Sequence, residues 1–339
     1  MNPPFRPAFL LGNRHVQTIW ASLLRRRPAA PLAAERWRLP DGDPLTVHFL
    51  MDVPGRPGVL ILHGLEGSAN ARYVVGLLDR VREAGWNGAA FDFRSCGHAA
   101  AQHDPPARGL YHAGKTDDLA FVVARLRERW GPAPLAVVGY SLGGNVVLKW
   151  LGETGAESPV CAAVTVSVPY DLGACAATID APGFWSYLYR ERFMRTLRRK
   201  ALAATPNYPT QLDPDAVRAC RTFADYDGTV IARLYGFASA QDYWARCSAR
   251  GFLAAIRRPT LLLSSADDPF IPADAIPREI IAENPALTLT VTDRGGHVGF
   301  IAGSPLRPRY FADDHTVQFL ADAFAQARLS TRDGFSASG

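Results

Sequence analysis

The sequence predicts an α/β fold, with a mostly parallel central sheet and helices on both faces of the sheet. Two observations lead to this prediction. Short apolar runs recur along the chain, and segments in which apolar residues have helical spacing separate them. The chain has 339 residues, of which 48% are hydrophobic, so it can bury the core of one large domain. We therefore expect a single domain over residues 1–339.

The predicted strands are short apolar or alternating segments, as expected for a buried sheet. In chain order they span 45–50, 59–62, 88–93, 135–138, 162–168, 260–264 and 287–292. The predicted helices span 72–84, 116–130, 143–151 and 314–327. The alternation of strand and helix breaks down between residues 171 and 258, where we expect an insertion. Residues 330–339 are predicted to form a flexible tail.

A turn between a predicted strand and a predicted helix carries the first chemical signal. Residues 139–143 read Gly-Tyr-Ser-Leu-Gly, after the apolar run 135–138. A G-x-S-x-G pattern in that context resembles the nucleophile elbow of α/β-hydrolases, a tight turn that exposes the serine hydroxyl. Glycine at both ends allows the close approach of the backbone that this turn requires. We predict that Ser141 is a nucleophile. The alternative is a glycine-rich turn that contains a serine by chance.

A serine hydroxyl is a weak nucleophile, so it needs a general base and a group that orients the base. Both follow in the order Ser, Asp, His of α/β-hydrolases. His297 follows strand 287–292 and is the predicted base; a loop histidine held by a backbone hydrogen bond is the alternative. Asp268 is the predicted acid, because a proline four residues later resembles the D-x-x-x-P of this superfamily. Asp267 competes for this role, and one of the two is expected only to cap a turn.

Acyl transfer also needs donors for the negative oxygen of the tetrahedral intermediate. Residues 63–67 read His-Gly-Leu-Glu-Gly and follow the predicted strand 59–62. The loop position predicts that the backbone amides of Leu65 and Leu142 form the oxyanion hole. We interpret His63 as a structural residue that bonds the loop backbone, although it could be mistaken for a second base.

The chain as a whole resembles the YheT-like branch of the α/β-hydrolases, which is related to ABHD-type lipases and to yeast medium-chain ethyl ester synthases. The resembling stretches are 13–19, 63–68, 73–77, 93–96, 111–119, 138–145, 266–270 and 295–300. Two positions depart from the family, which usually has proline at the position of Arg14 and glycine at that of Ser95. The resemblance implies hydrolysis or alcoholysis of carboxylic esters through an acyl-enzyme, without a cofactor.

The insertion at 171–258 is predicted to form a helical cap or lid. Its first distinctive segment carries four aromatic residues that we expect to line an acyl pocket: Phe184, Trp185, Tyr187 and Tyr189. Arginines follow up to residue 199 and could contact a membrane or an anionic head group. The alternative is a helix that packs its aromatic residues on the core and leaves its basic face in water.

The net charge, the cysteines and the apolar runs indicate which partners and which compartment to expect. The net charge is +5 with no recognised nucleic-acid motif, so we expect no nucleic-acid partner. Five cysteines without a C-x-x-C pair indicate reduced thiols and a cytoplasmic protein; Cys96 is expected to be a packing residue more than a reactive thiol. We see no signal peptide and no apolar run of about 20 residues that could span a bilayer.

We expect no metal site. The side chains from which one could be drawn match no zinc signature, and a serine triad needs no metal. They are His98, His103, Asp104 and His112. The sequence therefore predicts a serine hydrolase for esters with short- to medium-chain or lipid-like acyl groups. The alternatives are an acyltransferase that uses an alcohol in place of water, and a non-catalytic binding protein on the same fold.

Overall fold

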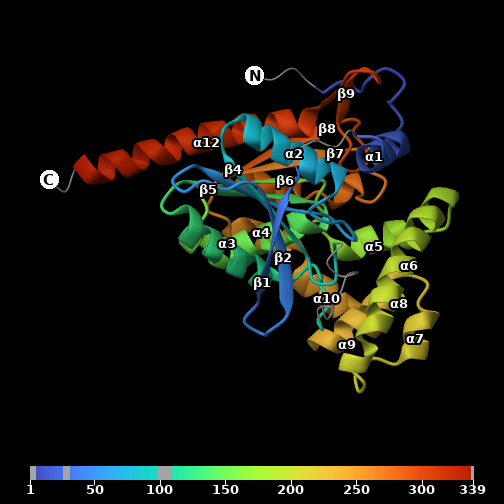
Figure 1. Cartoon of the computed structure of the whole chain (residues 1–339). Helices are drawn as coiled ribbons and strands as arrows, with labels where there is room; N and C mark the ends of the chain where they lie inside the picture. Colours follow the sequence, from blue (N-terminus) through green and yellow to red (C-terminus); the bar gives the residue numbers. More distant parts are fainter. Residues whose placement is uncertain (1–4, 26–30, 98–107, 337–339) are drawn as a thin grey trace.

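A computed structural model describes residues 5–25, 31–97 and 108–336 of the chain, with side chains up to residue 329. An eight-stranded sheet runs through its centre in the order β1-β2-β4-β3-β5-β6-β7-β8 (Figure 1). The six strands from β4 to β8 in this order are parallel, and β1 and β2 are antiparallel to their neighbours. The strands are β1 (Ala33–Arg38), β2 (Pro44–Met51), β3 (Gly58–Leu62), β4 (Asn87–Asp92), β5 (Leu135–Tyr140), β6 (Ala162–Val166), β7 (Thr260–Ser265) and β8 (Leu287–Thr292).

Helices cover both faces of the sheet, as the sequence predicts. The helices α2 (Arg72–Glu83) and α12 (Phe311–Ser336) lie together on one face, and α3 (Thr116–Trp130) and α4 (Leu142–Thr154) lie on the other (Figure 1). Consecutive side chains of a strand point to opposite faces. In β3, Leu60 and Leu62 accordingly join one core cluster and Val59 and Ile61 join the other. All four are fully buried.

The insertion between β6 and β7 is helical and lies beside the main sheet at the lower right of Figure 1. Its longest element is α6 (Phe184–Ala204), and a short π-helical turn, Asp227–Ile231, interrupts the later helices. The other helices are α5 (Leu172–Asp180), α7 (Pro214–Ala219), α8 (Phe223–Tyr226), α9 (Ala232–Tyr235) and α10 (Ala240–Cys247), followed by a 3₁₀ segment, Ala249–Ala255. Downstream lie α11 (Arg278–Glu283) and the small hairpin of β9 (Ile301–Gly303) and β10 (Pro308–Tyr310).

The two ends of the chain differ from the sequence prediction. An additional helix, α1 (Arg14–Leu23), begins after Asn13, whose side chain accepts hydrogen bonds from the backbone of the first turn. The first helical position is Arg14, and proline, the residue that the family resemblance implies there, also suits this position. At the other end α12 continues to Ser336, beyond the predicted helix end at residue 327, since extending a helix is far easier than starting one. The flexibility of 330–336 stays a prediction. Residues 337–339 lie outside the described residues.

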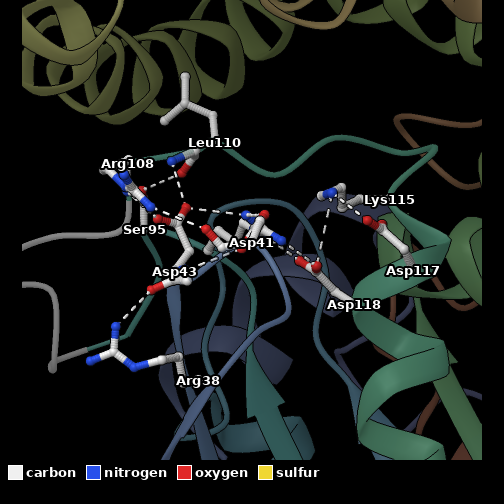
Figure 2. A network of polar contacts seen from close by, with 12 residues as sticks. Arg38, Asp41, Asp43, Ser95, Arg108, Leu110, Lys115, Asp117 and Asp118 are labelled. Atoms are coloured by element: carbon white, nitrogen blue, oxygen red, sulfur yellow. Dashed lines mark hydrogen bonds and ion pairs between the residues drawn. The ribbon is translucent and has the colours of Figure 1, made fainter.

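A buried ion network holds the loop that follows β4. Arg94 donates two hydrogen bonds to the Asp118 carboxylate, at 2.8 and 2.7 Å, and a third to Asp43 at 3.1 Å. Asp43 in turn accepts from the backbone N–H of Gly109 at 2.8 Å. Figure 2 shows these contacts, which join the β1–β2 hairpin, the loop and the start of α3. Ser95, beside Arg94, has φ of +60°, in the left-handed region that favours glycine, the residue that the family resemblance implies there.

Candidate active site

Ser141 lies at the turn between β5 and α4. Its backbone has φ of +52° and ψ of −122°, a strained conformation for a residue with a side chain, costing about 1–3 kcal/mol. The turn leaves no room for larger residues at its ends. A Cβ atom on Gly139 would lie 2.6 Å from the Gly143 carbonyl oxygen, and one on Gly143 would lie 2.5 Å from the His63 carbonyl oxygen. These contacts explain both glycines of the sequence motif.

The structure brings Ser141, His297 and Asp268 into one hydrogen-bonded chain. His297 Nε2 lies 2.9 Å from Ser141 Oγ, and His297 Nδ1 lies 2.8 Å from Asp268 Oδ2. A carboxylate can only accept, so Nδ1 carries the proton and Nε2 is free to accept the serine proton. The side chain of Asp268 is 1% exposed, and its Oδ1 accepts from the backbone N–H groups of Phe270 and Ile271.

The competing aspartate has a different contact. Asp267 Oδ1 accepts from the backbone N–H of Gly296 at 2.9 Å and so braces the loop that carries His297. The same loop is held by a residue that the sequence analysis did not single out: Thr18 of α1, whose hydroxyl accepts from the His297 backbone N–H at 2.9 Å. A Cβ on Gly296 would lie 2.4 Å from the Arg14 carbonyl oxygen, so α1 packs directly on the histidine loop.

The loop 63–67 lies against the serine. A Cβ on Gly64 would be 3.0 Å from Ser141 Cβ. His63 accepts at Nε2 from the Phe93 backbone N–H, so its Nδ1 carries the proton and donates to the Gly64 carbonyl oxygen at 2.7 Å. Burial lowers the pKa of His63 to about 4, which keeps the ring neutral at physiological pH. The interpretation of His63 as a residue that bonds the loop backbone agrees with these contacts.

The two predicted oxyanion donors have no competing acceptor. Among the described residues, no protein atom accepts a hydrogen bond from the backbone N–H of Leu65 or of Leu142. Leu142 is the first residue of α4, and the first N–H groups of a helix have no partner within it. Both residues line the cavity that contains Ser141, so both amides can serve a ligand there.

A cavity of about 950 Å³ is lined by residues of the insertion and of the loops that follow the strands, and Ser141 and His297 are part of its wall. Its apolar walls come from α5 and α6 and include Leu172, Ile179, Phe193 and Leu197. Two acidic residues, Glu66 and Asp227, line the same space, and Asp227 of the π-helical turn accepts from the Trp244 indole N–H at 2.7 Å. Burial raises the pKa of Asp227 to about 7, so part of the population carries no charge at neutral pH.

Of the four aromatic residues predicted to line an acyl pocket, one lines the cavity that contains Ser141. Tyr189 is buried and lines the cavity. Trp185, one turn earlier, stacks on His15 of α1 with 4.2 Å between the ring centroids. It borders a small separate pocket. Phe184 and Tyr187 are 73% and 60% exposed and line neither space. The cavity-facing stripe of α6 continues from Tyr189 towards its C-terminus, because residues three and four apart share a helix face.

The structure describes only one of the four side chains from which a metal site could be drawn. His98, His103 and Asp104 lie outside the described residues. His112 is buried, and its Nδ1 accepts from the Gly114 backbone N–H at 3.1 Å. Burial lowers the pKa of His112 to about 3. All five cysteines are free thiols, and burial raises the pKa of the Cys96 thiol to about 12, as expected for a packing residue. Within the described ranges, no helix has the length and apolar character needed to cross a bilayer.

Comparisons with known proteins agree with the fold. Residues 57–304 match the family model described as alpha/beta hydrolase fold. YheT of Escherichia coli (strain K12) is 34% identical over 322 residues, which cover 93% of this chain and 92% of YheT. The human Phospholipase ABHD3 is 28% identical over 312 residues, which cover 90% of this chain and 75% of ABHD3.

Among solved structures, the Pyrococcus furiosus esterase Pf2001 superposes with a TM-score of 0.56 at 18% identity, covering 96% of this chain and 99% of the esterase. The likeness of this structure concerns the fold alone, whereas the sequence matches reach the family. The chain therefore belongs to the α/β-hydrolase family, within its YheT-like branch. Like its relatives in this family, it is a hydrolytic enzyme.

Proposed function

We propose that the protein is a serine esterase that cleaves carboxylic esters through an acyl-enzyme on Ser141. The observation that carries this proposal is the unbroken hydrogen-bonded chain from Asp268 through His297 to Ser141, which ends at the wall of a large, mostly apolar cavity. The strained turn at Ser141 supports it, because a strained backbone at a cavity wall is typical of a functional residue.

The proposed reaction proceeds in two halves. His297 Nε2 takes the proton of Ser141 Oγ as the oxygen attacks the ester carbonyl, and Asp268 stabilises the imidazolium that forms. The amides of Leu65 and Leu142 donate to the negative oxygen of the tetrahedral intermediate. Collapse of the intermediate breaks the bond to the alcohol, which leaves with the proton from His297. In the second half His297 takes a proton from water, the hydroxide attacks the acyl carbonyl, and the carboxylic acid leaves as the proton returns to Ser141.

The cavity supports esters of short- to medium-chain or lipid-like acids as substrates. Its volume lies at the upper end of the roughly 300–1,000 Å³ range of small-molecule sites. Leu172, Ile179 and Leu197 offer an apolar surface for an acyl chain. Each methylene buried there contributes up to about 0.8 kcal/mol. The human relative named as a phospholipase is consistent with a lipid-like substrate.

Replacement of the nucleophile tests the proposal. Ser141→Ala should remain folded and lose several orders of magnitude of kcat on p-nitrophenyl butyrate, on the order of 10⁶-fold for the triad serine. Ser186→Ala on α6 is the matched control and should keep the wild-type rate. Addition of ethanol to the wild-type assay separates the acyltransferase alternative, because alcoholysis produces an ethyl ester. Equal turnover of the two serine variants would contradict the mechanism.

We also propose a peripheral lipid contact and a cytoplasmic location. Exposed apolar residues lie at the C-terminal end of α1 and on the first turns of α6, two helices that contribute to the cavity wall: Leu23, Leu24, Phe184, Tyr187 and Leu188. Such a surface can enter the head-group region of a membrane. Sedimentation with anionic lipid vesicles tests this contact, and Leu188→Asp should lower the bound fraction; unchanged binding would rule it out. The free cysteines suit a reducing compartment.

A further inference from the structure

The Leu65 amide belongs to a peptide plane that is fixed from the core side. The carbonyl oxygen of the same plane, that of Gly64, accepts from His63 Nδ1 at 2.7 Å and from the Gly67 backbone N–H at 3.0 Å. In a trans peptide the C=O and N–H groups point in opposite directions. The two donors therefore turn the Leu65 N–H away from themselves and towards the cavity that Ser141 shares.

The next peptide plane is fixed by a different group. The Glu66 backbone N–H donates to the hydroxyl oxygen of Tyr111 at 2.7 Å, and the same hydroxyl donates to Glu66 Oε1 at 2.8 Å. Tyr111 thus holds both the backbone and the carboxylate of one residue. Glu66 needs this support, because its φ of +55° lies in the left-handed region that residues with side chains rarely adopt.

The carboxylate of Glu66 is held in turn by the insertion. Lys200, near the end of α6, donates from Nζ to Glu66 Oε1 at 2.7 Å and to Cys96 Sγ at 3.0 Å. The side chains of Lys200 and Glu66 are 16% and 7% exposed, so water screens the pair little. Burial opposes the charged form of Lys200, but Cys96 and Glu66 outweigh it and raise its pKa, which keeps the ammonium charged.

We propose that Lys200 is a positioning residue for the oxyanion hole. Through Glu66 and Tyr111 it holds the loop 63–67 in the geometry in which the Leu65 amide meets the developing negative oxygen. The insertion then sets the rate of the chemical step as well as covering the substrate. This inference rests on the proposed esterase mechanism and adds to it a residue of the cavity wall that lies outside the triad.

A purely structural tether between α6 and the loop would have a different signature. A tether lowers the melting temperature of the protein when it is removed, but leaves kcat per folded molecule unchanged. A positioning residue changes transition-state stabilisation, so kcat falls while KM is nearly constant. It also weakens an inhibitor that forms a tetrahedral oxyanion adduct, such as an alkyl trifluoromethyl ketone, by the same factor as kcat/KM.

The experiment compares Lys200→Met, Lys200→Arg and Arg195→Met on p-nitrophenyl butyrate. Arg195 is the matched control, an exposed cation on the same helix that does not line the cavity. For Lys200→Met we expect kcat to fall by about tenfold or more, the size expected when a donor is misplaced, with KM within about twofold. Ki for the trifluoromethyl ketone should rise by the same factor. Lys200→Arg should restore most of kcat, and Arg195→Met should match the wild type.

Glu66→Gln provides a second route if Lys200→Met does not fold. It keeps the shape of the side chain and removes the charge that binds Lys200, so kcat should fall as in Lys200→Met, and the double variant should be no slower than the worse single variant. A wild-type kcat in Lys200→Met or in Glu66→Gln, or a lowered kcat with unchanged Ki, overturns the inference. Failure of the esterase mechanism looks different, because Ser141→Ala would then keep the wild-type turnover.

Discussion

At the scale of single residues, neighbouring side chains of the same type have different roles. Asp267 and Asp268 are adjacent in the chain, yet one braces a backbone N–H and the other orients His297. The sequence favoured Asp268 through a motif resemblance, and only the contacts separate the two physically. Lys200 and Glu66 could not be paired from the sequence, because 134 residues separate them and neither stands in a recognised pair motif.

Substitution of each aspartate by asparagine tests this division. Asp268→Asn should lower kcat by about 10³- to 10⁴-fold, because the amide favours the wrong tautomer of His297 and no longer stabilises the imidazolium. Asp267→Asn should cost less than about tenfold, because its amide oxygen can still accept from the Gly296 N–H. Steady-state kinetics on p-nitrophenyl butyrate provide the comparison, with melting temperatures as the folding control. A larger loss for Asp267→Asn would transfer the acid role to that residue.

At the scale of elements, the structure separates what periodicity can and cannot predict. The strands of the parallel sheet were predictable because buried strands are continuous apolar runs. The helix α1 was missed because it buries polar residues, His15, Gln17 and Thr18, that hide its amphipathic pattern. The aromatic residues of α6 indicated a pocket, but only the sheet and α5 determine which stripe of the helix faces it.

The cavity-facing stripe of α6 makes a prediction about acyl chain length. Leu197 is buried and lines the cavity, so Leu197→Ala adds space at the wall. The ratio of kcat/KM for the decanoate ester to that for the butyrate ester should rise, because each further methylene that finds room contributes up to about 0.8 kcal/mol.

The matched control for this prediction is Leu188→Ala on the exposed side of the same helix. This variant should keep the wild-type ratio, since Leu188 does not line the cavity. The ratio is independent of the fraction of folded protein, so a loss of stability in Leu197→Ala does not affect it. The same ratio in both variants would show that this stripe of α6 does not contact the acyl chain.

At the scale of the whole molecule, the central sheet brings together site residues from distant parts of the chain. Ser141, Asp268 and His297 follow β5, β7 and β8, whose carboxyl ends lie at one edge because the strands are parallel. The order of strand and helix was predictable from the sequence. The buried ion network around Arg94 was not, because it joins residues from three elements whose packing is set only by the complete fold.

This network predicts a large loss of stability when its central cation is removed. Arg94→Met removes the central cation from the buried carboxylates of Asp118 and Asp43, which should lower the free energy of unfolding by about 3 kcal/mol or more. Arg125→Met removes an exposed cation whose contact with Glu128 is long, and should cost less than about 1 kcal/mol. Urea unfolding gives both values. Similar losses of unfolding free energy in the two variants would mean that the buried network stabilises the fold no more than an exposed ion pair does.

The identity of the residue that becomes acylated is the central claim of this account, and covalent labelling measures it directly. The wild-type protein is treated with a fluorophosphonate, digested, and mapped by mass spectrometry. The account predicts a single adduct on the peptide that contains Ser141, formed at a rate that falls sharply in His297→Ala, because the histidine activates the hydroxyl. An adduct on another residue, or labelling of Ser141 at the same rate without His297, would contradict it.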